Sequence, residues 1–219
     1  MGMHVGIIAV KAEVGQLMAA FATCWPRHEL TTRASLGGLA ALHDWMRATQ
    51  RQVTAAAWSV NNPSTDTFGF WQDGEWAVML DPSYVQASDG RALAALSERF
   101  GLALSFVVET SGGCAFFDAF EQGRRVRRIQ SIDGAVTSEG ERLAQEAGLP
   151  AASYYMDETE QLQRAFGLTL LAQLPADHPV IGAAYLDRTD YGAQKRAREA
   201  HTPDAVAAPA PRRPWWRFW

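Results

Sequence analysis

Apolar residues near the start of the chain follow the spacing first of a strand and then of a helix. Residues 4–10 form a short apolar run that includes β-branched side chains, which predicts a buried strand. From Val14 to Phe21, apolar residues recur at i, i+3, i+4 and i+7, which predicts an amphipathic helix. This helix is expected to end before Pro26, because the residue that precedes a proline disfavours the helical conformation.

A second helix and a second strand are expected next. Ser35 is a candidate N-cap for a helix whose inward face carries Leu39, Leu42 and Met46. Residues 53–60 resemble a strand in composition.

The clearest local signal is a hairpin within residues 68–80. Asp73 and Gly74 lie between two apolar runs, which predicts a two-residue turn. This register pairs Trp71 with Trp76 at a non-hydrogen-bonded site, where side chains approach most closely. A structural pair of indoles is the favoured interpretation, and the floor of a ligand site is the alternative.

A helix and a three-stranded meander are predicted in the middle of the chain. Asp89 is a candidate N-cap, and Gly101 is a candidate stop for the helix between them. Residues 102–109, 114–121 and 124–132 are strand-like and are joined by short turns that contain glycine. Consecutive strands with such short connections predict an antiparallel meander.

The later elements complete an α+β domain. Asp157 and Glu160 have the spacing of a capping box, so a helix is expected there with Gly167 as its stop. Residues 168–174 are expected to form a late strand. We therefore predict an antiparallel sheet with a hairpin meander, helices packed on it and a flexible C-terminal arm.

The composition changes near residue 191. The predicted organisation is an α+β domain over residues 1–190, a polar helix and an Ala/Pro linker over residues 191–211, and a Trp/Arg tail over residues 212–219. Three of the eight tryptophans lie in the last five residues, interleaved with arginine. Such a tail is too short to fold alone, so it is expected to contact a surface.

Charge is distributed unevenly along the chain. The net charge of −4 divides into +4 for residues 192–219 and −8 for the remainder, which holds 14 basic and 22 acidic residues. An acidic body does not suit nucleic acid, because contacts with phosphates require clustered positive charge. It suits a basic protein partner, although solubility alone explains it equally well.

Cysteine usage and the N-terminus favour a cytoplasmic protein. Cys24 and Cys114 lie in unrelated contexts and are typical of buried small residues in a reducing compartment. The N-terminus has no basic region before its short apolar run, so no signal peptide is expected. No stretch approaches the roughly 20 apolar residues of a membrane span.

Few residues suggest catalysis, and no cofactor or metal is expected. Neither a P-loop nor a Gly-rich dinucleotide motif is present, and no histidine lies at metal-ligand spacing from another His or Cys. Cys114 is the one candidate nucleophile, but it begins an apolar run without a basic neighbour. Asp118 is a half-buried carboxylate without a second acid. A small-molecule enzyme that uses Cys114 or Asp118 remains an alternative.

Two groups of residues are candidates for binding a partner. The densest basic cluster of the body is Arg124, Arg125, Arg127 and Arg128. On a strand these residues divide two to each face, which favours a solvated, protected edge strand, with a contact patch for an acidic partner as the alternative.

The second group is the tail, with candidate contact residues Arg213, Trp215, Trp216, Arg217, Phe218 and Trp219. Trp and Arg are enriched at binding hot spots, which favours a docking peptide. Trp also favours membrane interfaces and Arg favours anionic lipids, so reversible membrane attachment is an alternative. Packing of the tail on its own domain or on a second copy is the third interpretation.

The stretch from Phe116 to Glu146 has a pattern of aromatic, glycine and acidic positions. The positions are Phe116, Phe120, Gly123, Val126, Arg127, Asp133, Gly134, Val136, Glu139, Gly140, Glu141, Leu143 and Glu146, preceded by Trp76, Asp81, Pro82, Leu96 and Ser97. This pattern resembles uncharacterised bacterial α+β domains, some of them grouped with the immunity proteins of toxin systems. The resemblance covers residues 76–146, about a third of the chain, and includes no catalytic residue. It implies a non-enzymatic, protein-binding protein of the immunity-like or adaptor kind.

Overall fold

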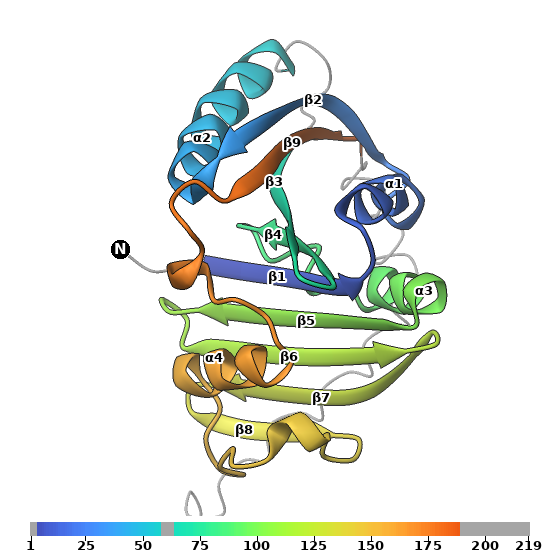
Figure 1. The fold of residues 1–219 in the computed structure, drawn as a ribbon, viewed down its shortest axis with the longest axis vertical. Coiled ribbons are helices and arrows are strands. Elements are labelled where there is room, and N and C mark those ends of the chain that lie inside the picture. Colours follow the sequence, from blue (N-terminus) through green and yellow to red (C-terminus); the bar gives the residue numbers. More distant parts are fainter. Residues whose placement is uncertain (1–3, 58–63, 189–219) are drawn as a thin grey trace, which may run out of the picture. The chain divides into compact units, whose positions relative to one another are not determined.

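The protein is built on a nine-stranded antiparallel sheet with helices on both faces (Figure 1). The computed structural model describes residues 4–57 and 64–188. The strands are β1 (His4–Lys11), β2 (His28–Gly37), β3 (Ser64–Asp73), β4 (Trp76–Asp81), β5 (Leu102–Glu109), β6 (Cys114–Glu121), β7 (Arg124–Ile132), β8 (Ala135–Glu139) and β9 (Pro179–Asp187). The helices are α1 (Val14–Cys24), α2 (Gly38–Ala57), α3 (Gly90–Phe100) and α4 (Met156–Ala165), with 3-10 turns η1 (Ala144–Glu146) and η2 (Leu171–Gln173). The predicted α+β class is confirmed.

The order of strands in the sheet is β2-β9-β3-β4-β1-β5-β6-β7-β8. The last four strands follow the sequence order, so the predicted meander over β5, β6 and β7 is confirmed and extends to β8. At the other end, β9 returns from late in the chain to lie between β2 and β3. The two edge strands of the described sheet are therefore β2 and β8.

Two apolar cores lie on opposite faces of the sheet. In β1, Ile7 and Ala9 belong to one core, whereas Ile8 and Val10 belong to the other. This division follows from the alternation of side chains along a strand. Helices α2 and α4 contribute to the first core, and α1 and α3 contribute to the second. Because apolar side chains cover both of its faces, all six residues of β4 are buried.

The hairpin between β3 and β4 has a different register from the predicted one. Asp73 pairs with Trp76, and Trp71 pairs with Val78, so the turn consists of Gly74 and Glu75. Gly74 has a φ of +57°, and glycine adopts this conformation at the first position of a two-residue turn without steric cost. Both indoles are buried in the same core, and Trp76 Nε1 donates to the carbonyl oxygen of Phe166 at 3.1 Å.

The predicted ends of α3 are confirmed. Asp89 Oδ1 accepts hydrogen bonds from the backbone N–H groups of Arg91 and Ala92, as an N-cap residue does. Gly101 follows the helix with a φ of +84°. This element could be predicted because both of its signals are local.

Several boundaries differ from the predictions. Residues 53–57 continue α2 rather than forming a strand, because Ala-rich sequence favours a helix, and residues 58–60 lie outside the described residues. Residues 168–174 hold η2 instead of a late strand. The capping box of α4 uses Glu158, which accepts from the backbone N–H of Tyr155 at 2.9 Å, and not the predicted pair two residues later. Strands β2 and β9 were not predicted.

The chain divides into two compact units, Met1–Arg188 and Thr189–Trp219. The second unit lies outside the described residues, so the linker over residues 191–211 and the tail over residues 212–219 stay predictions. Within the described segments, no helix has the length and apolar character that a membrane crossing requires.

A glycine in β1 lies against the loop that follows β4. A Cβ built at Gly6 would lie 2.9 Å from the carbonyl oxygen of Asp81, 2.9 Å from Tyr84 Cα and 2.8 Å from Ala87 Cβ. We expect Gly6→Ala to lower the free energy of unfolding by about 1–3 kcal/mol, because backbone atoms must move to admit the methyl group. The matched control is Gly15→Ala in α1, where nothing lies within 4 Å of the added Cβ. Urea unfolding should show no loss of stability for this control.

Candidate functional site

The four arginines of β7 lie on an inner strand, between β6 and β8. The prediction of an edge strand is therefore wrong. A register shift between Ala119 and Phe120 pairs these residues with Arg127 and Arg125, which leaves one extra residue in β7. This bulge places Arg125 on the same face as Arg128 and Arg127 on the opposite face.

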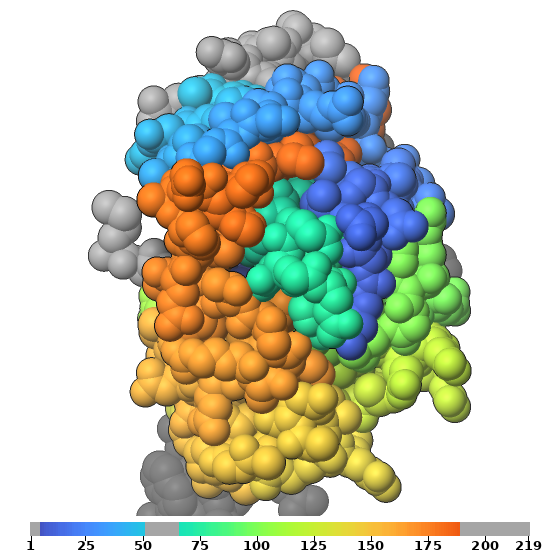
Figure 2. All heavy atoms as spheres, viewed as in Figure 1, coloured from blue at the N-terminus to red at the C-terminus, as the bar shows by residue number. Residues whose placement is uncertain are grey.

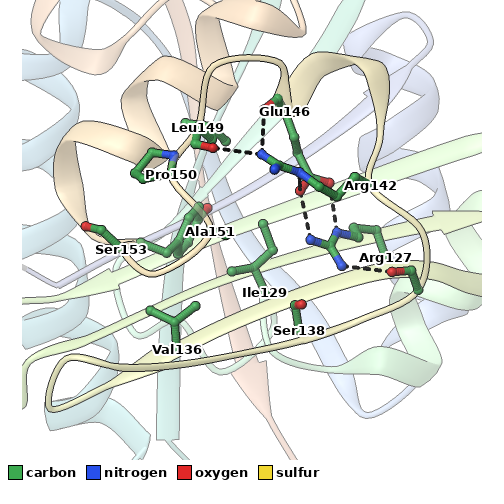
Figure 3. Close-up of a pocket in the computed structure, with 12 residues that line it drawn as sticks. Arg127, Ile129, Val136, Ser138, Arg142, Glu146, Leu149, Pro150, Ala151 and Ser153 are labelled. Atoms are coloured by element: carbon green, nitrogen blue, oxygen red, sulfur yellow. Dashed lines mark hydrogen bonds and ion pairs between the residues drawn. The ribbon is translucent and has the colours of Figure 1, made fainter.

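Arg127 forms a buried ion pair with Glu146 (Figure 3). Its Nε and Nη2 atoms donate to the two carboxylate oxygens of Glu146, each at 2.8 Å. Its Nη1 atom donates to the carbonyl oxygens of Glu139 at 3.2 Å and Gly140 at 2.9 Å. The side chains of Arg127 and Glu146 are only 6% and 2% exposed, so the guanidinium serves an internal contact and not a surface patch.

Glu146 also organises the segment that follows β8. Its Oε1 accepts from the backbone N–H of Leu143 at 2.9 Å. Arg142 approaches the same carboxylate at 3.6 Å, and its Nη2 donates to the carbonyl oxygens of Glu146 and Leu149 (Figure 3). One buried carboxylate thus fixes η1 against the sheet. In the sequence, Glu146 belongs only to the pattern that resembles immunity-like domains, and no local signal indicates that Arg127 is its partner.

The buried carboxylate of Asp118 binds two of the other arginines of β7, Arg125 and Arg128. Arg128 donates from Nε and Nη2 to the two carboxylate oxygens at 2.8 and 2.9 Å, and Arg125 Nε lies 3.0 Å from Oδ1. The bond to Asp118 raises the pKa of Arg128 above its ordinary value. Arg125 also lies over the ring of Phe120, 5.1 Å from its centroid. Asp118 therefore has partners that the sequence did not indicate, and they occupy its carboxylate.

Cys114 does not join Asp118 in a common site. Its Sγ lies 3.1 Å from the carbonyl oxygen of Gly112, at the start of β6. Four residues of strand separate Cys114 from Asp118, which corresponds to about 13 Å. The two candidate catalytic residues are on one strand, but the structure does not bring them together.

Two hollows lie beside β7 and β8. The first, of about 190 Å³, includes Arg127, Ile129, Val136, Ser138 and Arg142 in its lining (Figure 3). The second, of about 430 Å³, is lined by Gly113, Ser131, Asp133, Gly134, Ala152, Ser153, Tyr154 and Tyr155. Ser153 and Tyr154 line both hollows, so the two are neighbours.

Tyr154 is a buried polar group between these hollows. Its residue is 2% exposed, and its hydroxyl has no hydrogen-bond partner among the described residues. Burial raises the pKa of Tyr154 above its ordinary value, so the hydroxyl stays protonated.

The chain around these hollows is strongly acidic. Residues 129–165 contain seven Asp/Glu and two Lys/Arg. Of these acids, Glu146 is used in the buried pair, whereas Asp133, Glu139, Glu141 and Asp157 are exposed. The segment from β8 through α4, yellow to orange in Figure 2, forms the lower part of the surface seen in that view. We call β8 and this segment, residues 135–165, the acidic end of the sheet.

Metal-ligand side chains gather at the opposite edge of the sheet. His28, Asp66 and Asp187 lie on β2, β3 and β9, and their candidate ligand atoms are within 4.8 Å of one another. This cluster could not be predicted from the sequence, because it depends on β2 and β9, which were not predicted.

The remaining predicted contact residues are those of the tail. Arg213, Trp215, Trp216, Arg217, Phe218 and Trp219 lie outside the described residues. Arg124 is exposed at the start of β7.

The buried ion pair between Arg127 and Glu146 predicts how single and double variants differ in stability. Replacing Glu146 with Gln should lower the free energy of unfolding by about 3–5 kcal/mol, because the Arg127 charge is left buried without its counter-charge. The double variant Arg127→Met/Glu146→Leu should cost less than Glu146→Gln, because both charges are removed together. Urea unfolding of the two variants measures this difference, and a larger loss in the double variant would contradict it.

The control is the exposed pair of Glu160 and Arg164, whose atoms are 3.1 Å apart. Glu160→Gln should change the free energy of unfolding by less than about 1 kcal/mol, because solvent screens the pair.

Comparison of the chain with protein-family models, with curated proteins and with solved structures finds no match in any of the three.

Proposed function

We propose that this chain is a non-enzymatic protein-binding protein of the immunity-like or adaptor class, acting in the bacterial cytoplasm. Its folded body offers the acidic end to a basic segment of the partner. The tail supplies a second contact, with Trp215, Trp216 and Trp219 as anchors and Arg213 and Arg217 as charge complements.

The observation that carries this proposal is the coincidence of negative charge, an open sheet edge and hollows at the acidic end. Within the described sheet, β8 pairs with β7 alone. An edge strand offers unpaired backbone groups to an extended segment of another chain, and adjacent pockets select its side chains. The exposed carboxylates of Glu139 and Glu141 favour a positively charged segment over an acidic one.

The ion pairs of the β7 arginines also favour a basic partner over an acidic one. Arg127 and Arg128 are bound to Glu146 and Asp118, so their charges are already compensated. An acidic partner would have to compete with these carboxylates for guanidinium groups that are already paired. A basic partner meets exposed side chains such as Glu139, which is 69% exposed and has Arg125 at 3.9 Å.

The contacts of Asp118 and Cys114 favour binding over catalysis. A general acid or base must reach the proton that it transfers, and a nucleophilic thiol needs a cationic neighbour. Two arginines occupy the carboxylate of Asp118, and Cys114 Sγ lies 3.1 Å from the carbonyl oxygen of Gly112. Neither arrangement prepares a group for chemistry.

Membrane association through the tail is the second candidate, favoured by its interleaved Trp and Arg residues. The two candidates differ in what the tail tryptophans contact. Replacing Trp215, Trp216 and Trp219 with Ala should abolish vesicle binding if the tail inserts into lipid. Protein capture by the acidic end should then persist with reduced affinity.

The proposal predicts that reversing charge at the acidic end abolishes capture of the partner. The full-length variant Glu139→Lys/Glu141→Lys, used as bait in a lysate of the source cell, should lose a protein that the unchanged chain retains. The purified partner should then bind the unchanged chain directly, at least about 10-fold more tightly than the variant, with an affinity that falls as salt is raised.

The matched control reverses two exposed carboxylates elsewhere, in Asp44→Lys/Asp177→Lys. This control should retain the partner. Loss of capture in both variants, or in neither, would contradict recognition at the acidic end.

A further inference from the structure

One imidazole and two carboxylates meet at the β2 edge of the sheet. His28 begins β2, Asp66 lies in β3 and Asp187 ends β9. The three strands are neighbours in the order β2-β9-β3. Residues that are far apart in the sequence therefore contribute side chains to one place.

The strand register explains why the three side chains share a face. His28 pairs directly with Asp187, and Asp66 pairs with Tyr185, two residues earlier in β9. Directly opposed residues have Cβ atoms about 4.5–5.5 Å apart, and diagonal ones about 7–8 Å. Side chains of this length can reach a single point, which agrees with ligand atoms that all lie within 4.8 Å of one another.

The imidazole of His28 is held in place by its surroundings. Phe21 packs its ring edge-on against it, with centroids 5.7 Å apart. His28 Nε2 lies 3.0 Å from Asp66 Oδ2 and 3.3 Å from Gln86 Nε2. Gln86 is fixed in turn, because its backbone N–H donates to the fully buried carboxylate of Asp81 at 2.8 Å.

The charges at this cluster favour a cation. Asp187 is 1% exposed, and the side chain of His28 is 7% exposed, so water screens them poorly. Two neighbouring carboxylates repel one another in such surroundings, so a cation placed between them is favourable. Arg188, the next residue, is directed to Glu29 at 2.7 Å. A divalent ion would balance both carboxylates.

We propose that His28, Asp66 and Asp187 bind a divalent transition-metal ion, of which Zn²⁺ and Mn²⁺ are the representatives to test. The mixed set of one nitrogen and two oxygen ligands suits these ions, whereas Mg²⁺ and Ca²⁺ prefer oxygen alone. Tetrahedral zinc places such ligand atoms about 3.3 Å apart, close to the 3.0 Å between His28 and Asp66. The ion links edge strand β2 to β9 and β3, a role separate from the proposed partner binding.

Isothermal titration of the full-length, EDTA-treated chain with ZnCl₂ and MnCl₂ tests this proposal. One tight site is expected. Asp66→Asn should weaken it by more than about 100-fold, because even residues that only support metal ligands change affinity 10–100-fold. Asp66 is chosen because its side chain is 23% exposed, more than that of His28 or Asp187, so its replacement should disturb the fold least. Circular dichroism checks that the variant is folded.

The control variant His43→Ala/Asp44→Asn removes the same residue types from exposed positions of α2. It should bind both ions as the unchanged chain does. Absence of tight binding by the unchanged chain, or equal affinity in Asp66→Asn, would overturn the metal site. Neither result bears on capture of a protein by the acidic end, so failure of one proposal is distinguishable from failure of the other.

Discussion

Burial of the central strands on both faces is the constraint on which the rest of the structure depends. β4, β1 and β5 lie in the middle of the sheet, and each alternates between two apolar cores. Strands with two covered faces read as nearly continuous apolar runs, as residues 102–108 do in β5 apart from Ser105. Besides the buried carboxylate of Asp81 at the end of β4, the charged clusters described above lie toward the two ends of the sheet. The acidic end and the His28 cluster lie at those two ends.

Buried carboxylates have different neighbours at the two ends of the sheet. Around β7, each buried carboxylate is matched by arginine: Glu146 by Arg127, and Asp118 by Arg128 and Arg125. These pairs fix η1 against the sheet and link β6 to β7. Around β2, the candidate ligand atoms of Asp66, Asp187 and His28 lie within 4.8 Å of one another. The first arrangement pairs each carboxylate with arginine, whereas the second is the site proposed for a metal ion.

Local signals in the sequence predicted local structure and little beyond it. The cap of α3 at Asp89 and the meander could be predicted because their partners lie within a few residues. β2 and β9 could not, because β2 is polar and exposed along most of its length and its pairing partner lies about 150 residues away. The buried role of Arg127 depends on a bulge and on Glu146, 19 residues later. Charge clusters in a sequence therefore say little until the register is known.

Hydrogen–deuterium exchange of the full chain, free and bound to its captured partner, tests the central claim most directly. The free chain should exchange slowest in β1, β4 and β5 and faster in β2 and β8. Burial on both faces of the central strands makes the local opening that exposes backbone amides to exchange less favourable. Addition of the partner should give new protection in residues 135–155, with any protection of residues 212–219 reporting on the tail. New protection confined to other parts of the body, with residues 135–155 unchanged, would contradict recognition at the acidic end.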